Sequence, residues 1–210
     1  MTLEDSNSSD AAVQADELRR VDDVRTLRAL AHPVRIALIE ALSIGGPMTA
    51  TQVGEQIGES PTTCSFHLRQ LAKYGFVEEA GGGKGRARPW RMTSIGFNIV
   101  TSAADTESDI AARTLLRLVR ERQLDRYRTW LDSRASYPAS WQDAATESEY
   151  VFYLTPAELT DLKRELNDVL MPWLRDRLID QTRRPAGSLP VELLLWAFPI
   201  APAGSGTEAD

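Results

Sequence analysis

Cysteine and histidine are scarce in this 210-residue chain, which contains one cysteine, Cys64, and two histidines, His32 and His67. A single cysteine can form neither an intrachain disulfide nor a multi-cysteine metal site. No cluster of His, Asp and Glu at ligand spacing compensates for this, so we expect no metal and no cofactor. No serine, histidine and acid set can be nominated either, and we expect a protein that is not an enzyme.

Long apolar runs are also missing, since no stretch approaches the roughly 18 to 20 apolar residues of a membrane span. The opening residues, MTLEDSNSSDAA, have neither the basic start nor the apolar core of a signal peptide. We therefore expect a cytoplasmic protein that does not contact a membrane. Its 42% hydrophobic and 26% charged residues are typical of a globular chain rather than a disordered one.

The net charge of −6 is unevenly distributed. Between Pro33 and Ile95 seven basic residues stand against five acidic ones, a surplus of two positive charges, so the rest of the chain carries −8. The overall acidity argues against a protein that coats nucleic acid indiscriminately. A locally basic surface on an acidic protein suits an anionic partner that docks on one face.

Apolar residues at helical spacing predict two helices near the start of the chain. The first covers residues 16–31. The second begins at Pro33, because proline suits a first helical turn and the residue before it avoids the helical conformation. The breaker segment 43–47, Ser-Ile-Gly-Gly-Pro, ends the second helix. We expect residues 1–12 and 199–210 to be disordered tails.

A helix-turn-helix pattern follows. Thr49 is a suitable N-cap for a short helix that ends at Gly58. Ser60 and Pro61 then begin a longer helix over residues 61–74. The two helices are joined by a turn of about three residues containing glycine, as this motif requires.

Two short extended segments, residues 76–79 and 89–92, come next and flank a glycine-rich tip. The arrangement predicts a β-hairpin. Its basic residues indicate an arm, residues 80–91, that lies along a phosphate ridge or in the minor groove of DNA.

Small hydroxyl side chains at the start of the second helix would let its N-terminus approach a duplex closely, so that its free N–H groups meet phosphate oxygens. Cations farther along the helix can reach base edges or the backbone. Each feature alone is a weak signal, but in this order they favour DNA binding. We predict DNA contacts from Ser60, Thr62, Thr63, Ser65, Phe66, His67, Arg69, Gln70, Lys73, Lys84, Arg86 and Arg88.

Three residues allow a second interpretation. Cys64 is either a redox switch on this helix or a small buried hydrophobe, and its i, i+4, i+7 spacing with two leucines favours burial. His67 either contacts phosphate or packs at the helix surface. His32 is expected to belong to the junction between helices rather than to a site.

The second half of the chain is predicted to be α+β. A helix over residues 105–132 has apolar side chains on more than one stripe, which indicates dimerisation. Residues 149–154 and 190–198 have strand propensity. The sequence Thr155-Pro156-Ala157-Glu158 has the form of a capping box and opens a further helix, in which Pro172 marks a kink or break.

These elements predict a mainly α fold with a small β component, a winged helix-turn-helix, followed by an α+β region. We place the DNA-binding domain at residues 13–100 and a domain for dimerisation, and an effector if there is one, at residues 101–198. The polar segment 94–106 between them is either a helix start or a linker.

Aromatic residues gather in the second half, where four of the five tryptophans lie. One interpretation is a pocket for a flat apolar ligand, lined by Trp130, Tyr137, Trp141, Tyr153 and Trp173. The other, which we favour, is that these side chains fill the C-terminal core or a dimer interface.

Three stretches resemble ArsR-type winged-helix repressors. LRALAHPVRI at residues 27–36 is similar to the opening of that family, SPTTCSFHLRQL at 60–71 to its recognition helix, and GFV at 75–77 to the entry of its wing. The resemblance covers roughly residues 22–95. It implies a homodimer that binds an inverted-repeat operator, represses transcription and releases DNA when an effector binds. By position it assigns DNA contact to Thr62, Thr63, Ser65, Phe66, Arg69 and Gln70.

The sequence departs from that family in two respects. Metal-sensing members carry cysteines in the first helix of the motif, whereas residues 49–57 here contain none. The C-terminal hundred residues also exceed the minimal domain. We therefore expect a homodimeric DNA-binding regulator that does not sense metal, with a winged-helix module that binds protein, or a small-molecule enzyme in the C-terminal half, as the alternatives.

Overall fold

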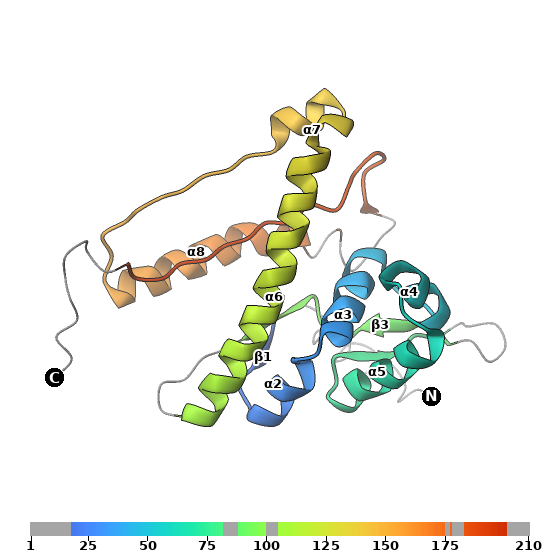
Figure 1. Cartoon of the computed structure of the whole chain (residues 1–210). Coiled ribbons are helices and arrows are strands. Elements are labelled where there is room, and N and C mark those ends of the chain that lie inside the picture. The colour runs from blue at the N-terminus through green and yellow to red at the C-terminus, as the bar shows by residue number, and fades with distance from the viewer. Residues whose placement is uncertain (1–17, 82–87, 100–104, 175–176, 178–182, 201–210) are drawn as a thin grey trace, which may run out of the picture.

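The computed structural model describes residues 18–81, 88–99, 105–174, 177 and 183–200. A group of short helices and strands forms the head of the molecule, and one long helix rises from it to a C-terminal arm (Figure 1). The described chain is mostly helical with a small β component, which confirms the predicted fold class. No described helix is long and apolar enough to cross a membrane.

The helices of the head begin at side chains that cap them. They are α2 (Val24–Leu30), α3 (Pro33–Gly45), α4 (Ala50–Ile57) and α5 (Pro61–Lys73). Thr49 forms a capping box with Gln52 at the start of α4, and Ser60 Oγ accepts the Thr63 N–H at the start of α5. The predicted helix-turn-helix is therefore confirmed to within a residue at each end, because its start and stop signals are local.

The predicted hairpin is present as β2 (Val77–Glu79) and β3 (Trp90–Met92), which pair in antiparallel register. Met48 adds an antiparallel bridge to Trp90 with hydrogen bonds in both directions. The segment before α4 thus joins the wing to the helices. The sequence gives no strong signal for this bridge, because one residue is too short to show a strand pattern.

The predicted helix over residues 16–31 is wrong in its first half. Residues Leu18–Val21 form β1, which pairs in parallel with β4 (Gly96–Ile99), a segment that we interpreted as a helix start or linker. Leu18 lies over Gly96, where an added Cβ would come within 2.9 Å of the leucine Cδ2. Asp23 then caps α2 by accepting the Thr26 N–H. Helical periodicity cannot reveal a strand whose partner lies far along the chain.

The long helix α6 (Thr106–Ser133) matches the helix predicted over residues 105–132. One hydrophobic core unites the head and extends into this helix. Ala111, Ala112 and Leu115 of α6 are buried in the same cluster as residues of α2, α3 and α5. No described residue after Leu115 is buried, although the half-buried Leu118 and Val119 still pack against this core.

The C-terminal arm consists of a 3-10 turn (Arg134–Ser136), α7 (Ala139–Ala144), α8 (Pro156–Leu174) and extended segments. The capping box of α8 is confirmed, since Glu158 accepts the Thr155 N–H at 2.7 Å, and the helix continues past Pro172. Residues 149–154 and 190–198 are extended but belong to no sheet, so the strands predicted there do not form within the described chain. Strand propensity supplies no ladder without a paired edge.

Candidate nucleic-acid interface

The turn between α4 and α5 is tightly closed. Gly58 adopts a left-handed conformation with φ of 73° and ends α4. The Glu59 N–H donates to the Gly54 carbonyl at 3.0 Å, and a Cβ at Gly54 would meet the Glu59 carbonyl oxygen at 2.6 Å. Only glycine therefore allows the turn to approach α4 this closely. The contact sets the angle at which α5 leaves the motif.

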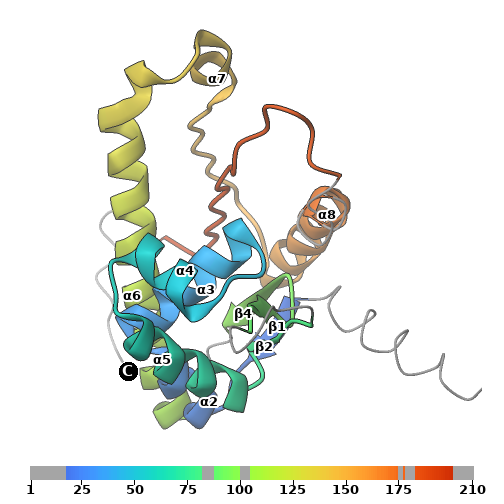
Figure 2. The same ribbon diagram turned by 90° about the vertical axis from the view of Figure 1, so that its right-hand side faces the viewer.

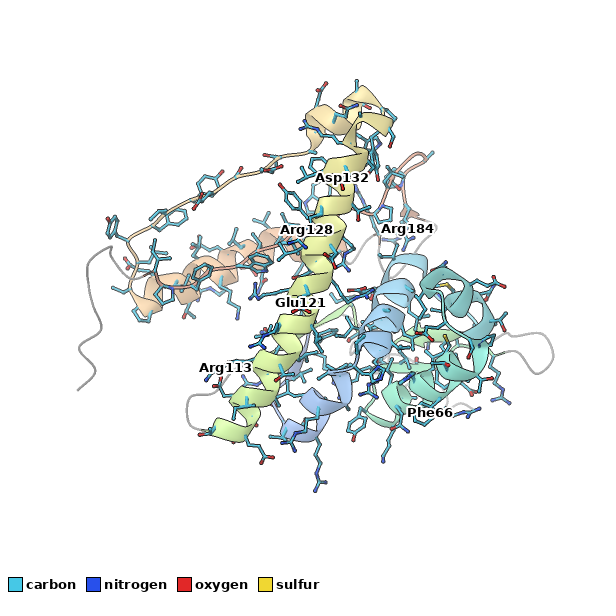
Figure 3. All side chains as sticks on the ribbon, viewed as in Figure 1. Phe66, Arg113, Glu121, Arg128, Asp132 and Arg184 are labelled. Carbon is cyan, nitrogen blue, oxygen red and sulfur yellow. The ribbon has the colours of Figure 1, made fainter. Side chains whose placement is uncertain are left out.

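Helix α5 has one buried and one exposed face. Cys64, Leu68 and Leu71 are at most 1% exposed and belong to the core. The opposite stripe follows positions i, i+4, i+7 and i+11 and is exposed; it consists of Thr62, Phe66, Arg69 and Lys73. Phe66 lies at the outer edge of the head (Figure 3), and its side chain is 56% exposed. Ser65 and Gln70 are half-buried beside this stripe.

The N-terminus of α5 presents hydroxyl groups and the backbone N–H of Thr62, because Pro61 has no N–H and the N–H groups of Thr63 and Cys64 donate to Ser60. Ser60 and Thr63 are occupied with each other, with their hydroxyl oxygens 2.8 Å apart. The side chains of Thr62 and Ser65 form no hydrogen bond within the described chain. A helix N-terminus of this kind attracts anionic oxygens through its free N–H group and the helix dipole.

The charges of α5 differ from those of the wing. Within the part of the chain that the structure describes, Arg69 and Lys73 form no ion pair. In the wing, by contrast, Arg88 pairs with Glu79 and Arg91 with Glu78, each at 2.7 Å. The described wing strands are thus close to neutral, and their surplus cations are the predicted contacts Lys84 and Arg86, which lie outside the described residues.

His67 requires a correction. It was predicted to contact DNA, but it lies on the inner side of α5 and is 8% exposed, with its ring centroid 4.4 Å from that of His32. Helical geometry explains this, because His67 lies three residues after the buried Cys64 and next to the buried Leu68. His32 Nδ1 accepts the Val34 N–H at 3.2 Å and caps α3, which confirms its predicted place at the helix junction.

Burial lowers the pKa of His67, and the neighbouring His32 and Arg35 lower it further. The pKa of His32 is lowered by burial and then by Arg35, and Glu59 acts in the opposite direction on both rings. The Nδ1 atom of His67 is buried without a described hydrogen-bond partner. The surroundings of both imidazoles therefore favour the neutral form.

Cys64 is buried, as its spacing predicted. Burial raises the pKa of its thiol, and the nearby Glu59 adds to the effect. A thiol kept protonated in the core is a poor nucleophile, so this geometry supports packing rather than redox sensing.

The five aromatic residues nominated for a ligand pocket do not share one site in the described chain. Trp130, Tyr137 and Trp141 are half-buried where α6, the 3-10 turn and α7 meet. Tyr153 is fully exposed and Trp173 is 63% exposed in the arm. The described residues also include no group of three His, Cys, Asp or Glu side chains that could hold a metal ion.

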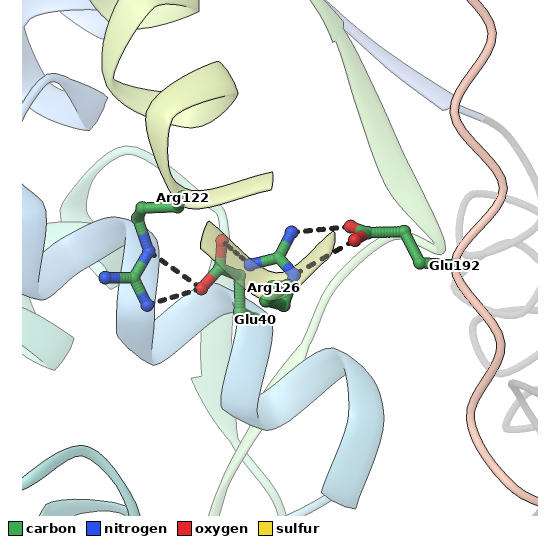
Figure 4. A network of polar contacts seen from close by, with 4 residues as sticks. All are labelled: Glu40, Arg122, Arg126 and Glu192. Carbon is green, nitrogen blue, oxygen red and sulfur yellow. Dashed lines mark hydrogen bonds and ion pairs between the residues drawn. The ribbon is translucent and has the colours of Figure 1, made fainter. Parts of the chain in front are cut away.

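A network of charged side chains escaped the sequence analysis. Glu40 of α3 accepts hydrogen bonds from Arg122 and Arg126 of α6, and Arg126 also donates to Glu192 of the last extended segment (Figure 4). Hydrogen bonds to Glu192 and Glu40 raise the pKa of Arg126. These residues are far apart in sequence, and no local pattern joins them. The network connects the head, the long helix and the arm.

The fold and the exposed stripe together define a winged helix-turn-helix. In comparisons with known proteins, residues 30–80 match a family described as "Helix-turn-helix domain". The chain is also similar to the solved structure of a MarR family regulator from Neisseria meningitidis, with 19% identity over 63% of this chain and 78% of that one and a TM-score of 0.31. Likeness at that level carries no argument about function. No curated protein matches the chain.

Proposed function

We propose that this protein is a DNA-binding transcriptional regulator of the ArsR type that acts as a homodimeric repressor in the cytoplasm. The observation that carries the proposal is the exposed stripe of α5, where Arg69 and Lys73 have no acidic partner in the described chain. A helix-turn-helix whose second helix presents hydroxyl groups, an aromatic ring and free cations matches the chemistry of a DNA groove.

In the proposed complex α5 enters the major groove. The Thr62 N–H and the hydroxyls of Thr62 and Ser65 meet phosphate oxygens, and Arg69 reaches base edges, where arginine most often recognises guanine. Phe66 is placed to touch thymine methyl groups. The wing, with Lys84 and Arg86 at its tip, adds contacts to the neighbouring backbone.

The regulatory part of the proposal rests on the resemblance to ArsR-type repressors over residues 27–77. Two copies would place two α5 helices on the half-sites of an inverted repeat. Binding there blocks transcription, and an effector of unknown identity would release the DNA. Residues 49–57 lack the cysteines of the metal sensors, so the proposed effector is not a metal ion.

The test is fluorescence anisotropy with duplex DNA from the protein's own upstream region, using wild type and Arg69→Ala. Loss of one base-reading arginine should weaken binding by about 1–3 kcal/mol, or about 5- to 150-fold. Arg117→Ala is the matched control, because Arg117 is also exposed and unpaired but lies on α6. Its affinity should equal that of wild type.

Removal of Lys84 and Arg86 together should also reduce the dependence of affinity on salt concentration, by about one unit of slope for each lost phosphate contact. If wild type binds no duplex, the alternative of a winged helix that binds protein is favoured. If wild type binds but both Arg69→Ala and the wing variant bind equally well, α5 is not the recognition helix. An enzyme is the weakest alternative, since the sequence nominates no acid, base and nucleophile set.

A further inference from the structure

The last extended segment, residues 190–200, contacts α6 through Glu192 and Trp196. Glu192 Oε1 accepts from Arg126 Nη2 at 2.5 Å, and the Trp196 ring lies under the Arg120 guanidinium at 4.5 Å. Both arginines belong to α6. In an extended chain alternate residues point in opposite directions. The odd-numbered residues therefore face away from α6.

These outward-facing residues are apolar. Val191, Leu193 and Leu195 are 74%, 61% and 56% exposed. A surface strand of a monomer normally turns its apolar side toward the protein and its charged side toward water. Here the charged Glu192 faces the protein together with the half-buried Leu194, whereas Leu193 and Leu195 face solvent. Apolar side chains thus lie on both sides of the segment, as is expected of a segment covered by a further protein surface.

The rest of the arm also exposes many apolar side chains. Helix α8 buries no residue, although it carries large apolar side chains that include Val169 and Trp173. Residues 150–154 are all exposed. Sixteen of the 23 exposed large hydrophobic residues of the described chain lie between residues 150 and 200, and we call this set the arm surface. A stable protein interface uses about 20–30 residues a side, so a set of sixteen with its polar neighbours is of matching size.

The backbone of the arm is also incomplete by itself. Residues 149–154 lead away from α7, α8 returns toward α6, and residues 190–200 lead away again, as Figures 1 and 2 show. This is the order of a strand, a helix and a second strand running the same way. Neither extended segment has a backbone hydrogen bond among the described residues. Both thus offer unpaired strand edges.

We infer that the arm surface is covered by the same surface of a second copy of this chain, and that residues 149–154 and 190–198 become β-strands in that dimer. An isologous interface presents one patch to an identical patch, so the apolar surplus of each copy would cover that of the other. The unpaired edges favour strand pairing between copies. The inference deepens the proposed function, since a regulator that reads an inverted repeat needs two heads. It also accounts for strand patterns that the single chain does not satisfy.

The first experiment measures the mass of the full chain by light scattering during gel filtration. Wild type should have the mass of two copies, and Leu193→Glu with Leu195→Glu should have the mass of one, because both side chains point away from the protein. Val169→Glu on α8 tests the same surface from a second element. Ile44→Glu is the control, since Ile44 is 48% exposed on α3 and lies outside the arm surface; it should remain a dimer.

The second experiment is hydrogen exchange on the same proteins, with circular dichroism to verify that the head stays folded. Amides of residues 149–154 and 190–198 should be protected in wild type and exchange at least about tenfold faster in the monomeric variant. A monomeric wild type, or variants that remain dimers with unchanged protection, would overturn the inference. DNA binding is scored separately, so a dimer that ignores DNA refutes only the proposed function, whereas a DNA-binding dimer that the arm variants leave intact refutes only this inference.

Discussion

Leu68 and Arg69 are neighbours in α5, but Leu68 packs in the core and Arg69 is proposed to contact DNA. Leu68 is fully buried in the core of the head, and Arg69 is exposed on the opposite face. Leu68→Ala should lower the free energy of unfolding by about 2–5 kcal/mol, because it leaves a cavity. Arg69→Ala should change it by less than about 0.5 kcal/mol while weakening DNA binding. Urea unfolding measures both variants, and a stable Leu68→Ala would show that α5 is packed differently.

The buried His32 and His67 pair predicts a loss of stability in mild acid. The folded state holds both pKa values below the ordinary value of about 6.5. Above that value both rings are neutral in the folded and unfolded states. As pH falls below about 6.5, the two histidines of the unfolded chain are protonated more readily than those of the folded chain, so the free energy of unfolding decreases. The stabilising contribution is therefore complete above about pH 6.5 and is lost below it.

Denaturant unfolding at pH 7.5 and 5.5 measures this effect. Wild type should lose stability over that interval. His67→Gln should lose less, because only one histidine with a lowered pKa then remains. Burial is the largest cause of both lowered pKa values, and Arg35 adds to it whereas Glu59 opposes it. An identical decrease in wild type and His67→Gln would show that other groups cause it.

At the scale of elements, the helix-turn-helix depends on the close approach at Gly54. Gly54→Ala should destabilise the protein by about 1–3 kcal/mol, because its Cβ would collide with the Glu59 carbonyl oxygen in the backbone of the turn. Alanine is otherwise the better helix former by about 1 kcal/mol. Thermal unfolding should thus show a lower midpoint, whereas the exposed Glu55→Ala in the same helix should not. A stabilised Gly54→Ala would mean that the backbone of the turn can move away from the added Cβ at little cost in free energy.

Elements with local signals could be predicted from the sequence, and those that depend on distant partners could not. Thr49, Ser60 and Asp105 cap helices close to the positions that the pattern indicates. The strand at Leu18–Val21 shows the opposite case, because its apolar residues also fit a helix and its partner lies at Gly96–Ile99. Within α5, it was easier to predict that the helix suits DNA than to predict which way each side chain points. The residue types around His67 suit DNA, but only the packed helix shows that this ring faces inward.

The molecule as a whole joins its head to its arm through the Glu40 network. Glu40 holds two arginines of α6, and one of these holds Glu192 at the base of the arm surface. All four side chains are between 20% and 39% exposed, so water screens them only in part. If the arm forms the dimer, this network determines where each head sits relative to the two-fold axis. Two α5 helices must lie about one turn of DNA apart, roughly 34 Å, to occupy both half-sites.

Glu192→Gln should therefore impair DNA binding without touching the DNA-facing residues. The substitution removes the charge that holds Arg126 to the arm, while Arg126 keeps Glu40 and the core of the head is unchanged. We expect affinity for a duplex with two half-sites to fall about 3- to 10-fold, corresponding to the worth of about 1 kcal/mol of one partly exposed ion pair. Affinity for a single half-site should stay at the wild-type value, because that contact uses the α5 helix and wing of one head.

Asp161→Asn provides the control, since Asp161 pairs with Arg164 in an exposed i,i+3 pair on α8 that does not reach the head. It should leave both affinities unchanged. A parallel fall on both duplexes would place the effect of Glu192→Gln in the head itself, and no fall on either would show that the arm is held by its apolar contacts alone. Only a loss confined to the paired half-sites identifies the network as the element that holds the two heads in register.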